Sequence, residues 1–314
     1  MNKNYKIFID GQAGTTGLRL AERLGERADI ELIRIEEAKR KDPGARLACM
    51  AEADVVFLCL PDGDALEIMS FQSAFAHCCV IDCSTAHRTS DGWTYGLPEI
   101  ESVSSGAGRI ANPGCHATGF VMSVRPLVDA GIIDPGAQIC FHSLTGYSGG
   151  GKAMIVEYKG TPRAPRQYGL AQAHKHLPEM QKYSGLETAP LFAPIVCDFY
   201  SGMLVSVPLP RSALRRPASA ETIQTELKNY YAGKPLVKVR EPGYELSEAA
   251  GAGFLSADAF ANRDDIEIFV TGNDDKIVVV SRYDNLGKGA SGAAIQNMNL
   301  LLGLPEEAGL TIGD

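Results

Sequence analysis

The sequence predicts an α/β protein with a doubly wound parallel sheet, followed by an α+β region built on a mixed sheet. Three observations indicate this class. Strand-like and helix-like segments alternate over the N-terminal third, a glycine-rich turn follows the first strand-like run, and strand-like runs dominate after Gln138. The 314 residues are enough for two domains with sizeable cores.

The composition excludes several classes of protein. The chain is 45% hydrophobic and 22% charged with a net charge of −8, and its longest basic run is Lys39-Arg40-Lys41, so we expect no nucleic-acid partner. No apolar run reaches the length of a membrane span and no signal precedes the first strand, so we expect a cytoplasmic protein without membrane association. The eight cysteines show no CxxC or zinc spacing, which predicts reduced thiols and no metal.

The elements of the first domain follow in order. A strand is predicted over Lys6–Asp10, and a glycine-rich turn over Gly11–Gly17 leads into a helix over Leu18–Leu24. Further strands are predicted over 30–35, 54–60 and 79–82, with helical segments between them, notably 64–76.

The turn after the first strand has the spacing GxxGxxG rather than GxGxxG. Its strand–turn–helix context predicts a Rossmann-type phosphate loop, although an ordinary turn is the alternative. The candidate cofactor-binding residues here are Gly11, Ala13, Gly14, Thr15, Thr16 and Gly17. Lys39-Arg40-Lys41 favours NADP, because a basic cluster could bind a 2′-phosphate, but it could equally be a solvated charged turn.

Cys115 follows a Pro-Gly corner and opens a segment, Thr118–Leu127, that is predicted to be a helix. A thiol at a helix N-terminus meets backbone N–H groups and the positive end of the helix dipole, which both favour the thiolate. Cys115 is therefore the candidate nucleophile.

An activated cysteine usually has a base within reach. The best candidates are His174 and His176 in Ala173–Met180, with a capped, exposed helix start as the alternative and a metal site less favoured. His116 follows Cys115, but a helix turns it about 100° away, so adjacency in sequence is poor support for partnership. The glycine-rich segment 146–152 suggests a backbone approaching an anion, or else a flexible loop.

The second domain begins after Cys115. Strands are predicted over 138–144, 202–209, 236–240, 265–271 and 276–283, with a hairpin turn at Asn273–Asp275 and helices over 222–231 and 288–302. Such a sheet would have a broad apolar face to cover, so we expect a homodimer or homotetramer through this domain.

These motifs together resemble the N-acetyl-γ-glutamyl-phosphate reductases of the shorter form, essentially from end to end. The resemblance is carried by the segments 11–17, 82–88, 95–99 (YGLPE), 112–115 (NPGC), 146–152, 174–179 and 284–299. Glyceraldehyde-3-phosphate and aspartate-semialdehyde dehydrogenases share the architecture and cysteine chemistry, but not this combination. This chain has His116 where the family more often has Tyr.

The resemblance implies an NADPH-dependent reduction of N-acetyl-L-glutamyl 5-phosphate to the 5-semialdehyde, in arginine biosynthesis, through a thioester on Cys115 with His174 as acid–base catalyst. It places Arg88, Ser148, Tyr168, His176 and Glu179 at the substrate, and Ser84 and Asn285 with the glycine turn at the cofactor. It also implies a discontinuous nucleotide domain, 1–114 with 286–314, and a catalytic and oligomerisation domain, 115–285.

Three alternatives stay open at this point. The enzyme could act on another acyl phosphate, such as aspartyl phosphate, as aspartate-semialdehyde dehydrogenases do. It could be a Cys–His hydrolase or transferase that uses no nicotinamide, or a non-catalytic sensor that binds a dinucleotide.

Overall fold

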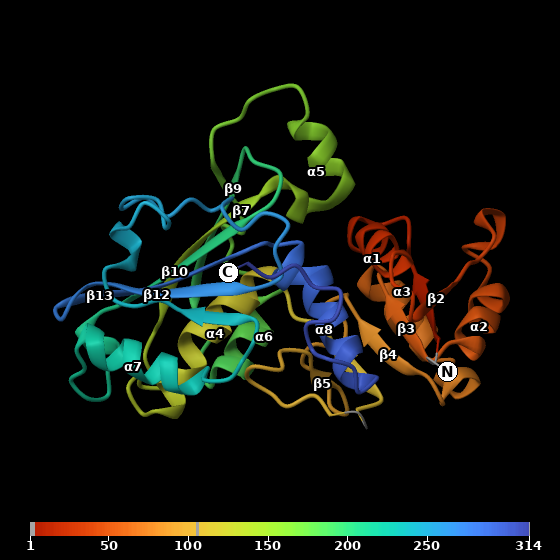
Figure 1. Cartoon of the computed structure of the whole chain (residues 1–314), viewed down its shortest axis with the longest axis horizontal. Helices are drawn as coiled ribbons and strands as arrows, with labels where there is room; N and C mark the ends of the chain where they lie inside the picture. Colours follow the sequence, from red (N-terminus) through yellow and green to blue (C-terminus); the bar gives the residue numbers. More distant parts are fainter. Residues whose placement is uncertain (1–3, 105–106, 314) are drawn as a thin grey trace. The chain divides into compact units, whose positions relative to one another are not determined.

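The computed structural model describes residues 4–104 and 107–313 (Figure 1). The chain forms two compact units: Met1–Pro113 with Ala290–Leu310, and Gly114–Gly289 with Thr311–Asp314. The functional domain limits expected from the sequence, 1–114 with 286–314 and 115–285, stay predictions.

The first unit contains a six-stranded sheet in which every pair of neighbours is parallel. The strand order is β2-β1-β3-β4-β6-β5. The strands are β1 (Tyr5–Asp10), β2 (Ile30–Ile33), β3 (Val55–Leu58), β4 (Cys79–Asp82), β5 (Thr94–Tyr95) and β6 (Arg109–Ala111). The predicted doubly wound parallel sheet is confirmed, and the order reverses at β1 and β3, which is where such sheets bind ligands.

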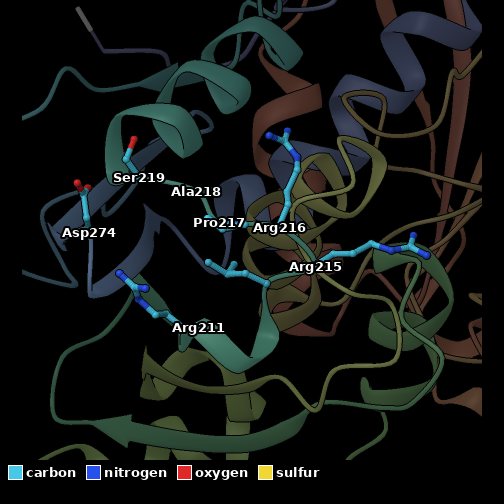
Figure 2. A pocket seen from close by; sticks show the side chains of 8 residues that line it. Arg211, Arg215, Arg216, Pro217, Ala218, Ser219 and Asp274 are labelled. Carbon is cyan, nitrogen blue, oxygen red and sulfur yellow. The ribbon is translucent and has the colours of Figure 1, made fainter.

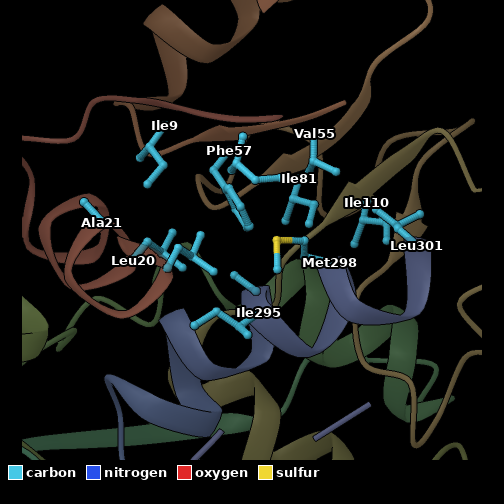
Figure 3. Packing of buried hydrophobic residues seen from close by; sticks show 13 residues of the cluster. Ile9, Leu20, Ala21, Val55, Phe57, Ile81, Ile110, Ile295, Met298 and Leu301 are labelled. Carbon is cyan, nitrogen blue, oxygen red and sulfur yellow. The ribbon is translucent and has the colours of Figure 1, made fainter. Parts of the chain in front are cut away.

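Helices cover both faces of this sheet. α1 (Thr15–Gly25) and α8 (Gly292–Leu301) pack on one face through Leu20, Ile295 and Met298, which meet Phe57 and Ile81 of the strands (Figure 3). The strands are therefore apolar on both faces, as their unbroken hydrophobic runs predict. Each such side chain stabilises the fold by about 1.5–3 kcal/mol on burial.

The opposite face of the sheet is covered by α2 (Pro43–Glu52) and α3 (Asp62–Met69). α2 lies between two predicted strands, where the sequence analysis expected a helical segment but gave no limits for it. Its start has a clear signal, because Asp42 accepts the N–H of Ala45 at 2.7 Å and Pro43 is the first helical residue. The helix predicted over 64–76 instead ends at Met69, where the Ser70 hydroxyl donates to the Glu67 carbonyl at 2.6 Å, and a 3₁₀ turn follows.

The second unit contains a seven-stranded mixed sheet, which confirms the predicted class. Its order is β11-β12-β13-β10-β7-β9-β8, with β7/β9 and β11/β12 parallel and the other neighbours antiparallel. The strands are β7 (Cys140–Gly146), β8 (Arg166–Gln167), β9 (Leu191–Cys197), β10 (Met203–Leu209), β11 (Val237–Val239), β12 (Ile266–Asn273) and β13 (Lys276–Tyr283). The predicted hairpin joins β12 to β13, where Asn273 Oδ1 accepts the N–H of Asp275 at 3.0 Å.

Three helices, α4 (Cys115–Asp129), α6 (Leu177–Ser184) and α7 (Ala220–Tyr230), lie along one face of this sheet (Figure 1). Phe120 of α4 packs on Phe141 of β7 with ring centroids 4.4 Å apart, and Phe141 stacks on Phe192 of β9 at 4.6 Å. α5 (Gly151–Tyr158) follows β7. The helix predicted over 288–302 begins as a π-helical turn, Gly287–Ser291, and continues as α8.

Candidate active site

Cys115 is the first residue of α4, so the helix begins three residues before Thr118. The N-cap residue, Gly114, has no side chain that could cap the helix, and its backbone is extended (φ −74°, ψ 144°). The first-turn N–H groups therefore meet no capping side-chain oxygen from Gly114. A thiolate at this position gains about 0.3–1 kcal/mol from the helix dipole.

The backbone on either side of Cys115 is held by two buried side chains of other elements. Glu179 of α6 is 1% exposed and accepts the N–H of Gly114 at 3.0 Å. Tyr283 of β13 donates its hydroxyl to the Cys115 carbonyl at 2.6 Å. Burial raises the pKa of the Tyr283 phenol well above its ordinary value, so this hydroxyl stays a donor.

Gly289 packs directly against the nucleophile. A Cβ atom added at Gly289 would lie 2.9 Å from the Cys115 Cβ and 3.2 Å from the Asp284 carbonyl oxygen. The Gly289 N–H donates to that same carbonyl at 2.9 Å. A glycine is therefore required where the π-helical turn passes Cys115, and turns of this kind are frequent at functional sites.

Three imidazole rings meet beside the start of α4. The ring centroids of His174 and His176 are 4.7 Å apart, and His116 lies 5.8 Å from the first and 5.7 Å from the second. The His176 backbone N–H donates to His174 Nδ1 at 3.2 Å, so neutral His174 carries its proton on Nε2. The structure thus brings both predicted candidate bases to the helix that begins with Cys115.

His116 is a site residue that the sequence analysis did not select. Its ring is buried, and it links two hydroxyls: Nδ1 lies 2.8 Å from Ser143 Oγ and Nε2 lies 2.6 Å from Tyr168 Oη. Burial, and then the charge of His174, lowers the pKa of His116 to about 3. Burial and the charge of Cys115 raise the pKa of the Tyr168 phenol far above its ordinary value.

Ser148 and Asn285 lie together in the second unit. The Asn285 side-chain amide donates to Ser148 Oγ at 3.1 Å, and its Oδ1 accepts the Gly202 N–H at 2.9 Å. Ser148 belongs to the 3₁₀ turn Tyr147–Gly150 after β7, so part of the segment predicted as an anion site or flexible loop is ordered. These contacts hold the hydroxyl of Ser148 in place.

The glycine turn of the first unit fits a bound dinucleotide. Gly11 has a positive φ of 84°, and a Cβ added there would lie 2.3 Å from the Cys59 carbonyl oxygen. A Cβ at Gly17 would lie 2.5 Å from the Gly11 carbonyl oxygen, whereas Gly14, the N-cap of α1, has only ordinary contacts. The turn therefore folds tightly at the start of a helix with no capping side chain, which is the cradle that a pyrophosphate needs.

Ser84 and Arg88 follow β4, whose carboxyl end lies at the same edge of the parallel sheet as the glycine turn. Ser84 donates to Asp82 through both its N–H, at 2.8 Å, and its hydroxyl, at 2.9 Å. Asp82 also binds His87 Nδ1 at 2.6 Å, and Arg88 Nε donates to the Asn112 carbonyl at 2.9 Å. This network fixes both predicted residues in a buried loop.

The basic cluster after β2 is partly neutralised by its own neighbours. Lys39 pairs with Glu36, and Arg40 pairs with Glu37, each at 2.9 Å and largely exposed to solvent. Exposed pairs at this spacing contribute little and exchange readily. The glycine turn therefore fits a dinucleotide, and the charges of this basic cluster are compatible with either NAD or NADP.

A cavity of about 460 Å³ lies elsewhere in the second unit and contains none of the predicted site residues. It is lined by Arg211, Leu214, Arg215, Arg216, Pro217, Ala218, Ser219 and Asp274. In Figure 2 the three arginine side chains point in different directions, so they do not converge on one anion. Among residues 4–104 and 107–313, no group of three or more His, Cys, Asp or Glu side chains could hold a metal ion, and no helix is long and apolar enough to cross a membrane.

Two family models match the chain. The "Semialdehyde dehydrogenase, NAD binding domain" matches residues 34–105, and the "Semialdehyde dehydrogenase, dimerisation domain" matches residues 115–285. Curated relatives match almost the whole chain. An N-acetyl-gamma-glutamyl-phosphate reductase 2 from Nostoc sp. is 45% identical, covering 99% of this chain and 100% of the relative, and a reductase of that name from Trichormus variabilis is 44% identical with the same coverage.

Solved structures with the same fold are more distant in sequence. Aspartate semialdehyde dehydrogenase II from Vibrio cholerae superposes with a TM-score of 0.70 at 17% identity, covering 96% of this chain and 98% of that one. The enzyme from Candida albicans, solved with NADP, has a TM-score of 0.63 at 18% identity, covering 95% and 98%. At this identity the likeness shows the fold alone.

Proposed function

This chain belongs to the N-acetyl-gamma-glutamyl-phosphate reductase family, and from that premise we propose that it reduces N-acetyl-L-glutamyl 5-phosphate to N-acetyl-L-glutamate 5-semialdehyde in arginine biosynthesis. The observation that carries the proposal is the placement of Cys115 in the first turn of α4, whose next residue, His116, packs against the His174–His176 pair. That arrangement supplies a nucleophile and an acid–base group.

In the first step the Cys115 thiolate attacks the acyl carbon. A C–S bond forms, the bond from carbon to the phosphate oxygen breaks, and phosphate leaves a thioester on Cys115. The first-turn N–H groups of α4 stabilise the negative charge on the carbonyl oxygen. Glu179 and Tyr283 act by holding the backbone around Cys115, through their bonds to Gly114 and to the Cys115 carbonyl.

The nicotinamide, when bound, supplies the hydride that reduces the thioester carbon. His174 donates its Nε2 proton to the carbonyl oxygen as negative charge develops there. It takes the proton back when the C–S bond breaks, which releases the aldehyde and restores the Cys115 thiolate. The bond from the His176 N–H to His174 Nδ1 supports this role, because it keeps the proton of neutral His174 on Nε2.

We assign substrate binding to Arg88, Ser148, Tyr168, His176 and Glu179. A guanidinium binds a phosphate or carboxylate through paired N–H donors. The bond from Arg88 Nε to the Asn112 carbonyl orients the guanidinium of Arg88. We assign the dinucleotide to Gly11, Ala13, Gly14, Thr15, Thr16, Gly17 and Ser84, together with Asn285. NADP is the proposed form, because Lys39, Arg40 and Lys41 can exchange weak surface pairs for a 2′-phosphate.

We also propose that the enzyme is a cytoplasmic homodimer or homotetramer. On the sheet face opposite α4, Cys140 and His142 of β7 are exposed, and neighbouring Leu191 of β9 is 49% exposed. An apolar leucine and a thiol on an open sheet face are suited to a second copy. Light scattering at several protein concentrations tests this, and a monomer at micromolar concentration would contradict it.

The reverse reaction gives the simplest assay of the activity. N-acetylglutamate 5-semialdehyde, phosphate and NADP⁺ should produce NADPH, and omission of phosphate or alkylation of Cys115 should stop it. Aspartate semialdehyde serves as the competing substrate, and NAD⁺ as the competing nucleotide. Faster turnover of aspartate semialdehyde would overturn the substrate assignment, and no NADPH binding in a fluorescence titration would overturn the reductase assignment.

A further inference from the structure

His116 occupies a position that the proposed steps leave unused. It directly follows the nucleophile, its side chain is 2% exposed, and its ring contacts those of Tyr168, His174, His176 and Phe192. Both of its ring nitrogens lie within hydrogen-bond distance of a hydroxyl, at 2.8 Å from Ser143 and 2.6 Å from Tyr168. A buried polar ring with both nitrogens engaged is held in one orientation.

The imidazole of His116 is neutral throughout the physiological range, because its pKa is lowered to about 3. A neutral imidazole has one donor and one acceptor nitrogen. If Ser143 donates to Nδ1, Nε2 must donate to the Tyr168 oxygen. The phenolic proton of Tyr168 is then available to a third group. The hydroxyl lies 2.6 Å from the side chain of the residue that directly follows Cys115 in α4.

Tyr168 is also held through its backbone and its ring. It follows the two-residue strand β8, and its backbone N–H donates to the Pro194 carbonyl at 3.0 Å. Its ring packs against that of His174 in a tilted arrangement, with centroids 5.8 Å apart. The bond to His116 fixes the hydroxyl end of the side chain.

From these contacts we infer that His116 is a positioning residue, which holds the Tyr168 hydroxyl so that it donates to the oxygen of the acyl group on Cys115. The inference rests on the proposed reductase function, and it adds a side-chain donor to the backbone N–H groups at that oxygen. The hydrogen bond from such a donor strengthens as negative charge develops on the oxygen in the transition state. Loss of the donor therefore lowers kcat more than it raises KM.

The test is a double-mutant cycle on kcat in the reverse reaction. His116→Phe and Tyr168→Phe should each lower kcat by about 10- to 100-fold, the effect of a misplaced catalytic group. The double variant should be no slower than Tyr168→Phe alone, because His116 acts only through that hydroxyl. The inference would be overturned if the kcat of the double variant fell by the product of the two single-variant factors, or if His116→Phe kept the native kcat.

Amide substitutions make the test independent of folding defects in the phenylalanine variant. The amide of His116→Gln reaches the place of Nε2 and should restore kcat to within about 5-fold of the native enzyme, a small part of the loss expected on misplacement. The shorter amide of His116→Asn reaches only the place of Nδ1 and should not. Equal kcat values for these two variants would refute a specific role for Nε2.

Controls separate this inference from the function on which it rests. His77, an exposed histidine of the first unit, provides the matched variant His77→Gln, which should keep native kcat. If neither the native enzyme nor this control turns over the semialdehyde, the proposed function fails. If both do and His116→Phe matches them, only the positioning role fails.

Discussion

The hydroxyl of Tyr283 bridges the first turn of α4, donating to the Cys115 carbonyl at 2.6 Å and accepting the Gly119 N–H at 3.0 Å. An ideal α-helix pairs these two backbone groups directly, since they are four residues apart. A side chain inserted at this place changes the local path of a helix. The residue that carries the nucleophile is thus connected to β13, 168 positions away along the chain.

Gly119 is the first target that follows from this bridge. A Cβ at Gly119 would lie 2.6 Å from both the Ser281 and Tyr283 hydroxyl oxygens. Gly119→Ala should therefore destabilise the protein by about 1–3 kcal/mol, as overpacking does. Gly63→Ala is the matched control, because Gly63 is also helical and has open space around it. Gly63→Ala should be neutral or should stabilise the protein by up to about 1 kcal/mol. Thermal unfolding measures both variants, and equal changes in their melting temperatures would contradict a role for the bridge.

A second pair of glycines tests the dinucleotide cradle within a single helix. Gly17→Ala places a Cβ 2.5 Å from the Gly11 carbonyl oxygen, whereas Gly25→Ala meets only Leu32 Cδ1 at 3.7 Å. The first should weaken NADPH binding by at least about 10-fold, or about 1.4 kcal/mol, and the second should leave it unchanged. Fluorescence titration measures both, and native affinity in Gly17→Ala would show that the turn does not shape the site.

The buried pair of Asp10 and Arg46 predicts a stability effect with a definite dependence on pH. Arg46 binds Asp10 at 2.6 Å, and the two residues are 9% and 3% exposed. Burial raises the pKa of the Asp10 carboxyl, and Arg46 opposes that rise. Arg46→Met should cost about 3–5 kcal/mol near pH 7, because it leaves an unpaired buried charge.

The loss in Arg46→Met should shrink as the pH falls, since a raised folded-state pKa means that protonation of Asp10 relieves the cost. Asp10→Asn combined with Arg46→Met should recover more than half of the stability. Denaturation midpoints for the single and double variants at pH 7 and pH 5 would decide, and a loss that grows in acid would contradict the account.

The burial of His116 predicts that the folded protein loses stability in acid. Its pKa is about 3 in the folded protein, against 6.5 for an unperturbed histidine, so the unfolded chain binds a proton that the folded one does not. Its contribution to stability is complete above pH 6.5 and is lost as the pH falls toward 3, by about 1.4 kcal/mol per pH unit. The groups facing it are Ser143, Tyr168, His174 and His176.

Thermal unfolding of the native enzyme and of His116→Gln, measured at pH 7.5 and pH 5.5, tests this contribution. The variant should lose less stability over that interval than the native protein does. Identical losses would mean that His116 takes up its proton in the folded state as readily as in the unfolded one.

Much of the fold could be predicted because its signals are local. Continuous apolar runs such as Val55–Leu58 indicated buried parallel strands, and β4 and β13 have the predicted limits. β9 was missed because Pro194 lies within it, and proline argues against a strand. β5 and β6 are two and three residues long, too short for any periodicity to appear.

The candidate site was only partly predictable, because its decisive contacts join distant parts of the chain. The helix dipole at Cys115 could be derived from the residues, and the grouping of His174 with His176 and Tyr168 from the resemblance. The partners of His116 could not, since Tyr168 and Ser143 are 52 and 27 positions away from it. Because successive side chains of a helix point about 100° apart, there was a sound reason to doubt that His116 pairs with Cys115. That rotation gave no sign of the Ser143 and Tyr168 hydroxyls that His116 contacts instead.

The choice between His174 and His176 as the acid–base group is open to direct measurement. His174→Ala should lower kcat by about 10²–10⁴-fold, as the loss of general acid–base catalysis does. His176→Ala should act mainly on KM for the semialdehyde, in keeping with its assignment to substrate binding. If His176→Ala lowered kcat and His174→Ala acted mainly on KM, the roles of the two histidines would be exchanged.

The covalent step on Cys115 is the central claim, and mass spectrometry of the intact enzyme tests it most directly. Mixing the protein with N-acetyl-L-glutamyl 5-phosphate in the absence of nucleotide should produce an acyl adduct on the peptide that contains Cys115. Addition of NADPH should remove the adduct and release the semialdehyde, and Cys115→Ser should form none. An adduct on another residue, or turnover by Cys115→Ser at the native rate, would contradict the account.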